Sequence, residues 1–434
     1  MILQLIFVII YLKYTSLLTA SFKFLRLISL FFISLYSFQL VLAIIDPYNI
    51  STPISLPTII FFNLQIIFFI CGLRLYLKYN KINTIVHPVY NYNINKFILF
   101  LHSLLFVSTF SKFLKMRTYM STLGDELNQA RAFYFTKLYA SYTDMILDSI
   151  LGSFVYISYF YMFHLFLFKR EKLTVVDWYM ILSTLSMFIL STMSSLGRGE
   201  IMRLGVLFIF FVLFSKVYYG QIFKKKIIPI SVILGGVISI VLFITTLMRN
   251  NLLHSSSADV VELLDYLFLK PFASYFYVPV LAFDFGKDHI WGDLSPMFGG
   301  ATFAGFIDFI LLPFVYLDKN LGMINGILGD RMSPFFTFPV SGNSWNALFT
   351  GCSNYYIDFW YFGTMIFPLL HGYLLAKFTN KSLRSNTAFI ILIFLFIGSY
   401  DNLVSSPVQS MNIVFLLLLL IAYKMSFKIS VKLK

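Results

Sequence analysis

The chain has 434 residues, of which 59% are hydrophobic, 19% aromatic and only 12% charged, and its mean hydropathy is +0.81. Soluble domains carry about 25% charged residues, so this composition excludes an ordinary soluble domain. Lysine and arginine outnumber aspartate and glutamate by 33 to 19, which gives a net charge of +14. In a membrane protein such an excess first indicates orientation, and nucleic acid is not needed as a partner to explain it.

Long apolar runs predict membrane-spanning helices, because a helix needs about 20 apolar residues to cross a bilayer core of about 30 Å. The sequence therefore predicts an all-α, polytopic membrane protein with about eleven transmembrane helices. In chain order these helices are expected near residues 1–20, 27–45, 56–76, 95–114, 145–168, 174–193, 201–219, 227–248, 355–376, 386–402 and 409–427.

The predicted helices divide the chain into three parts: helices 1 to 8 in residues 1–248, a large loop in 249–354, and helices 9 to 11 with a short tail in 355–434. A structureless loop of that length is uncommon, so a folded subdomain is expected. It contains an amphipathic stretch, Val260–Phe285, and an apolar segment, Phe303–Tyr316. The apolar segment is short and contains Asp308, so the sequence leaves open whether it is membrane-embedded.

The basic residues gather in alternate connections, as the positive-inside rule requires. An outside N-terminus puts the basic runs near Lys13, at 74–96, at 169–172, at 216–226, at 377–384 and in the tail after Lys424 on the cytoplasmic side. The only acids on that side are Glu171 and Asp177. The charge pattern therefore predicts an outer N-terminus, a cytoplasmic C-terminus and an outer large loop.

Six arginines remain on the predicted outer side, where basic residues are scarce: Arg117, Arg131, Arg198, Arg203, Arg249 and Arg331. A guanidinium group matches phosphate oxygens in a bidentate fashion, so these residues are candidates for binding a lipid pyrophosphate. Arg198, Arg203 and Arg249 lie at or just inside predicted helix ends, at the depth of such a group. The alternatives are interfacial anchoring for these three and a solvated surface for Arg117 and Arg131.

Four residues are candidates for a general base on the outer side: Glu200, His254, His289 and Asp358. Glu200 and Arg203 are three residues apart and can pair on one helical face. His254 and His289 are the only histidines expected outside. Asp358 lies in the first turn of the ninth helix, where an acid is also favoured by the helix dipole. No acids have a clear metal-ligand spacing, so a mechanism without metal or cofactor is expected.

The arrangement resembles the Wzy-type polymerases of O-antigen or oligosaccharide repeat units. The resemblance spans nearly the whole chain and rests on Arg198–Gly199 at a helix start, on Arg249 before the large loop, and on the exit of that loop. The exit reads NALFTGCSNYYIDFWYFG, with Asn346, Thr350, Asp358, Phe359 and Gly363 at the positions that carry the likeness. The family often has glycine soon after Asp-Phe, whereas Trp360 follows here.

The resemblance implies a GT-C-like glycosyltransferase in the bacterial inner (cytoplasmic) membrane that acts on the periplasmic face. Its substrates would be two oligosaccharides linked to undecaprenyl pyrophosphate, and the growing glycan would be transferred en bloc to the new unit. The arginines would stabilise the leaving pyrophosphate. Asn346 and Tyr355 would contact glycan, although aromatic belts also explain the tyrosine. A polysaccharide chain-length regulator would be a partner.

Two other functions fit part of the pattern. An O-antigen ligase is expected to have histidine before the asparagine of the loop exit, where this chain has Trp345. A flippase or other transporter of lipid-linked oligosaccharide is expected to have charged or broken helices at the membrane midplane. The predicted helices carry almost no charge in their central parts, so the sequence favours the polymerase.

Overall fold

The computed structural model describes part of the chain. The described residues are 4, 7–11, 13, 23–80, 94–123, 142–169, 172–195, 199–218, 235, 236, 240, 270–291, 295–317, 336, 337, 340, 344, 345, 351–401 and 410–432. They belong to two compact units, one formed by 1–88 and 270–414 and the other by 89–269 and 415–434.

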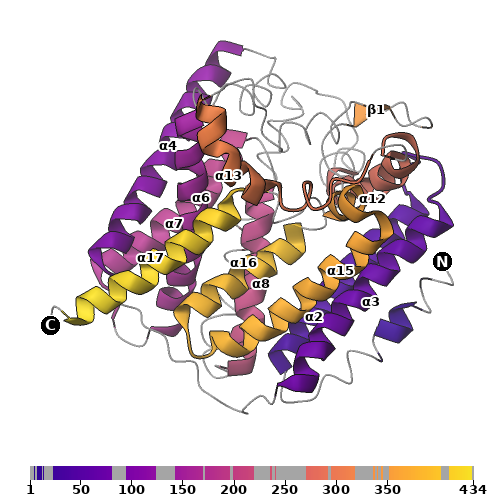
Figure 1. The fold of residues 1–434 in the computed structure, drawn as a ribbon. Coiled ribbons are helices and arrows are strands. Elements are labelled where there is room, and N and C mark those ends of the chain that lie inside the picture. The colour runs from indigo at the N-terminus through magenta and orange to yellow at the C-terminus, as the bar shows by residue number, and fades with distance from the viewer. Residues whose placement is uncertain are drawn as a thin grey trace. The chain divides into compact units, whose positions relative to one another are not determined.

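The first unit is built around a pair of closely packed helices, α3 (Leu56–Tyr79) and α15 (Gly351–Ser382). The helix α2 (Lys23–Ile45) lies beside α3, and α16 (Asn386–Asp401) packs on α15 (Figure 1). The unit also contains α12 (Lys270–His289), α13 (Ala304–Leu317) and a short antiparallel pair of strands, β1 (Phe336–Thr337) and β2 (Ser344–Trp345). The described parts of the predicted large loop therefore belong to the same compact unit as α2, α3 and α15.

Two glycines explain how closely α3 and α15 approach each other. A Cβ atom at Gly72 would lie 1.9 Å from the carbonyl oxygen of Leu369, and one at Gly372 would lie 2.2 Å from the carbonyl oxygen of Phe69. Each helix thus places a glycine against the backbone of the other. Small residues at helix contacts are the usual means of close packing in a membrane, where the hydrophobic effect does not drive helices together.

The second unit is a helical bundle centred on α7 (Val175–Ser195), which contacts α4 (Lys96–Leu123), α6 (Tyr142–Phe168) and α8 (Gly199–Tyr218). The helix α17 (Asn412–Lys432) also lies mostly in this unit, and the hydroxyl groups of Tyr161 and Tyr423 are 3.1 Å apart. A buried histidine, His102, links three helices through Ser158 at 2.9 Å and Ser183 at 2.5 Å.

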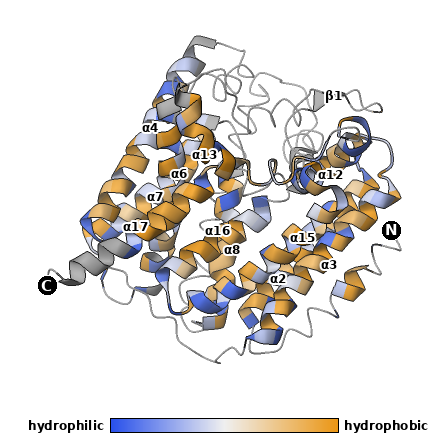
Figure 2. Ribbon diagram, in the orientation of Figure 1, coloured by the Kyte–Doolittle hydropathy of each residue, from blue (hydrophilic) through white to orange (hydrophobic). Residues whose placement is uncertain are grey.

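Seven helices within the described residues are long and apolar enough to cross a membrane. They are Lys23–Ile45, Leu56–Tyr79, Lys96–Tyr119, Ile146–Leu165, Val175–Ser194, Glu200–Tyr218 and Ser353–Ser382. Figure 2 shows how strongly hydrophobic residues dominate these helices in both units. The chain is therefore an all-α, polytopic membrane protein. The predicted helices at 1–20 and 227–248 lie largely outside the described residues, so the count of eleven and the sidedness stay predictions.

The apolar segment Phe303–Tyr316 forms the helix α13, whose 14 residues span about 21 Å at the usual rise per residue. That length is well short of a bilayer core of about 30 Å. The amphipathic stretch Val260–Phe285 corresponds to α12 from Lys270 onward, and its first ten residues lie outside the described part of the chain.

Candidate functional site at the break in α15

The helix α15 is interrupted immediately after Asp358. Phe359 has φ −142° and ψ 22°, and Trp360 has φ 48° and ψ −132°, so neither residue is helical. Beyond this point the helix resumes, and a Cβ atom at Gly363 would lie 2.2 Å from the carbonyl oxygen of Tyr355. Only glycine fits such a close approach of the backbone to itself. The Asp-Phe and Gly363 of the loop-exit pattern are thus parts of one kinked backbone.

Asp358 binds the segment before α13 to this break. Its carboxylate is fully buried and accepts hydrogen bonds from the backbone N–H of Ala301 at 2.7 Å and of Thr302 at 2.6 Å. Two backbone hydrogen bonds join the same two segments of the chain. They run from Met297 N–H to the Ile357 carbonyl at 3.1 Å and from Phe298 N–H to the Asp358 carbonyl at 3.2 Å. A carboxylate just before α13 is also favoured by the positive end of that helix.

Two exposed aromatic residues flank the break with unusual backbone conformations. Phe298 has φ 49° and Trp360 has φ 48°, in the left-handed region that bulky residues rarely adopt. Their side chains are 76% and 48% exposed. Backbone strain of this kind persists only where the surroundings enforce it, and it is concentrated at functional sites. Here the bonds around Asp358 provide that enforcement.

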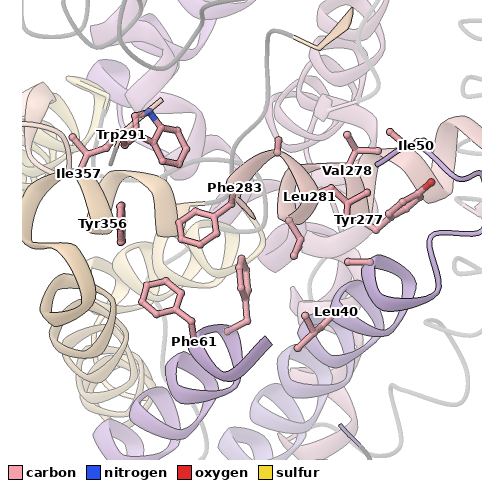
Figure 3. Close-up of a cluster of buried hydrophobic side chains, with 14 of the residues drawn as sticks. Leu40, Ile50, Phe61, Tyr277, Val278, Leu281, Phe283, Trp291, Tyr356 and Ile357 are labelled. Carbon is pink, nitrogen blue, oxygen red and sulfur yellow. The ribbon is translucent and has the colours of Figure 1, made fainter. Parts of the chain in front are cut away.

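A cluster of buried aromatic side chains packs around Tyr356, two residues before Asp358 (Figure 3). Phe61 of α3 stacks on Phe283 of α12, with 5.4 Å between ring centroids, and both rings meet Tyr356 of α15 edge to face. Trp291, which follows α12, is also fully buried in this cluster. Aromatic pairs in these geometries stabilise contacts beyond the burial of their area, so α3, α12 and α15 are held firmly together.

Two other predicted site residues of this unit have described positions, Tyr355 and His289. Tyr355 is buried and stacks on Phe367 at 4.9 Å, so it packs inside the unit. His289 is exposed at the end of α12, and its ring lies 4.5 Å from that of Phe285. Within the described residues no hydrogen bond joins His289 to Asp358, although the aromatic cluster connects the elements that carry them.

A polar cluster that the sequence analysis missed lies near the start of α3. Asp284 of α12 accepts hydrogen bonds from the Ser55 N–H at 2.9 Å and from the hydroxyl groups of Ser55 and Thr58, each at 2.5 Å. The buried Lys287 lies 3.4 Å from the same carboxylate. An i, i+3 spacing of Asp284 and Lys287 was the available signal, but nothing local to α12 indicates the partners on α3.

These contacts explain the acidity of Asp284. Burial by itself raises the pKa of this carboxyl, but the hydrogen bonds from Ser55 and Thr58 and the charge of Lys287 outweigh burial. The pKa of Asp284 is consequently below its ordinary value. The carboxylate acts as an N-terminal cap for α3, supplied from a different helix.

In the second unit the structure describes three of the predicted residues. Glu200 and Arg203 form an ion pair of 2.5 Å at the start of α8, so the pairing predicted from their spacing is present. Arg117 is exposed on α4. The remaining predicted residues of the chain lie outside its described part: Arg131, Arg198, Arg249, Arg331, His254 and Asn346. Among the residues with a described position, no three His, Cys, Asp or Glu side chains are grouped as metal ligands.

Comparisons of the chain with protein-family models, with curated proteins and with solved structures found no match. The fold and the site above therefore stand on the sequence pattern and on the geometry alone.

Proposed function

We propose that the chain is a Wzy-type polymerase of O-antigen or oligosaccharide repeat units, acting at the periplasmic face of the bacterial inner membrane. The observation that carries this proposal is the junction at Asp358. Three residues of the loop-exit pattern, Asp358, Phe359 and Gly363, lie at or beside the kink in α15. A match of sequence letters that arose by chance would not be expected to coincide with such a backbone feature. Exposed aromatic rings, which suit stacking on sugars, flank the same junction.

The proposed reaction moves the whole growing glycan. An acceptor hydroxyl oxygen at the non-reducing end of the new unit forms a bond to the anomeric carbon that carries the pyrophosphate. The bond between that carbon and the pyrophosphate oxygen breaks, and undecaprenyl pyrophosphate leaves with the electron pair. The hydroxyl proton passes to a base, and positively charged groups stabilise the leaving group.

The geometry suggests different roles for the two described candidates of the first unit. Asp358 uses its carboxylate oxygens to position the segment 297–302, so we assign it a positioning role. His289 is exposed at the end of α12, and an imidazole is among the groups that act as general bases in enzymes. We therefore favour His289 over Asp358 as the base.

Deletion of the gene from its own cell tests the proposal, with lipopolysaccharide separated on a gel. Loss of a polymerase leaves lipid A core with a single repeat unit. Loss of a ligase leaves core with no unit, and loss of a flippase strands the units on the cytoplasmic side. A single-unit band that reverts to a ladder when the wild-type gene is restored supports the proposal, and either of the other patterns overturns it.

A further inference from the structure

A small pocket lies inside the first unit, among α2, α3, α15 and α16. Its volume is about 40 Å³. Its lining is mostly apolar, with side chains such as Phe32, Ile66 and Phe69. It also contains a group of polar residues: Tyr36, Gln65, Tyr355, His371 and Ser399. Among the residues with a described position, no lysine, arginine, aspartate or glutamate lines the pocket, so these residues offer an ionic ligand no counter-charge.

The hydrogen bonds around Ser399 define what His371 can do. The Ser399 hydroxyl donates to the Leu395 carbonyl at 3.0 Å. In the tautomer with its proton on Nε2, His371 then donates to the Ser399 oxygen at 2.6 Å. Tyr36 donates its hydroxyl to the Ser399 carbonyl at 2.7 Å. A neutral imidazole that donates through Nε2 carries its lone pair on Nδ1. His371 thus presents an acceptor.

Gln65 supplies the complementary group. Its side chain is 5% exposed, and within the described residues its amide nitrogen Nε2 is buried without a hydrogen-bond partner. Buried polar groups in proteins nearly always have a partner, and leaving a donor unsatisfied in a membrane interior is costly. A pocket of about 40 Å³ exceeds the 10–15 Å³ that one water needs, so there is room for an occupant that meets this amide.

We propose that this pocket binds a neutral hydroxyl group, which accepts a hydrogen bond from Gln65 Nε2 and donates one to His371 Nδ1. Water can supply the hydroxyl, and so can a lipid alcohol whose carbon chain lies against the aromatic lining. Both sources share one chemistry. The pocket adjoins the junction at Asp358 through Tyr355, which is one of its lining residues. The proposed hydroxyl site itself uses Gln65 and His371, which have no role in the proposed transferase reaction.

Labelling of the full-length protein in lipid nanodiscs tests the site and separates the two sources. X-ray radiolysis oxidises side chains beside bound water, so oxidation of Tyr36, Phe69 and His371 would indicate water in the pocket. A diazirine-bearing octanol, activated by light and competed by excess octanol, reports the alcohol arm. Gln65→Met keeps the size of the side chain and removes its amide. It should lower labelling of the pocket residues, by radiolysis or by the diazirine, severalfold. Gln39→Met is the matched control, because Gln39 is buried on α2 and donates to the Phe276 carbonyl at 2.7 Å.

Radiolytic labelling that falls in Gln65→Met but not in Gln39→Met supports bound water. Octanol cross-links to residues of the pocket that show the same dependence support a lipid alcohol. If Gln65→Met fails to fold, the wild-type protein still decides, because absence of both kinds of labelling at the pocket overturns the proposal. Equal labelling in the wild type and in Gln65→Met overturns it as well.

Discussion

Two carboxylates of the first unit, Asp284 and Asp358, act in the same way on helices that are not their own. Asp284 of α12 binds the N-terminal end of α3, and Asp358 of α15 binds the backbone just before α13. In both cases backbone N–H groups that have no partner within their helix donate to a charged acceptor. These residues therefore join helices as well as cap them. Replacing either residue should destabilise more than one helix.

Separate effects on stability and activity are expected for Asp358 and His289. Asp358→Asn replaces a charged acceptor of two N–H groups, which should lower the free energy of unfolding by roughly 1.5–3 kcal/mol and shorten the O-antigen ladder. His289→Gln should shorten the ladder with an unchanged melting temperature, because His289 is exposed. Thermal unfolding in detergent and lipopolysaccharide gels measure the two effects. A full ladder in His289→Gln would exclude this residue as the base.

Acid should destabilise the protein partly through Asp284. Its pKa is lowered in the folded chain, so the folded state stays ionised where the unfolded chain begins to bind a proton. The contribution of Asp284 to stability is complete above the ordinary pKa of about 3.9 and is lost as the pH falls through the lowered pKa of the folded chain. Melting temperatures between neutral pH and pH 3 should thus fall less steeply in Asp284→Asn. An identical slope in Asp284→Asn and in the wild type would contradict this role of Asp284.

At the scale of the elements, the sequence predicted the helices well and their irregularities poorly. Apolar length alone located α2, α3, α4, α6, α7, α8 and α15. The break in α15 was not predicted, because Phe359 to Phe362 are ordinary residues for a membrane helix, and their distortion depends on bonds to residues 297–302. The capping of α3 by Asp284 was missed for the same reason: its partners are distant in sequence.

The contact of α3 with α15 should not tolerate a larger residue. Gly72→Ala and Gly372→Ala each place a methyl group against a backbone carbonyl, which cannot move aside as a flexible side chain would. We expect each change to lower stability by roughly 1–3 kcal/mol, measured by thermal unfolding. Gly235→Ala has nothing within 4 Å of the added carbon and should be nearly neutral. Wild-type stability in both α3 and α15 variants would contradict the close approach.

Replacing Trp360 with glycine should stabilise the backbone at the break and remove an exposed aromatic ring. Trp360→Gly relieves the positive φ, worth roughly 1–3 kcal/mol, and should raise the melting temperature. If Trp360 contacts glycan, the same variant shortens the ladder, so stability and activity move in opposite directions. Phe362→Gly is the matched control: it removes a neighbouring exposed aromatic from regular helix and should lower stability. A lower melting temperature in Trp360→Gly would refute the strain.

At the scale of the whole molecule, the apolar helices establish a multi-pass membrane protein. Its predicted orientation depends instead on the charge pattern of the connections. The predicted pyrophosphate site depends on arginines from several connections. Two of them, Arg198 and Arg249, lie outside the described residues. The length of an apolar helix can be predicted from consecutive residues. A site assembled from several connections depends on contacts between residues that are distant in sequence.

Reporter fusions measure the predicted orientation directly. A fusion at Lys225 should be active only as a cytoplasmic reporter, and one at Ser341 only as a periplasmic reporter, because the basic residues select the cytoplasmic side. Alkaline phosphatase and green fluorescent protein provide the two readouts in the same cell. A cytoplasmic signal from Ser341 would show that the sidedness after residue 248 is inverted.

The cap on α3 also has a consequence for synthesis of the chain. Ser55 and its acceptor Asp284 are separated by 229 residues. At a translation rate of about 5–20 residues per second, the carboxylate is made about 10–45 s after the helix that it caps. During that interval the nascent α3 carries an unpaired amino-terminal turn, which is available to water, lipid headgroups or the insertion machinery, and the first unit cannot close until α12 has been translated.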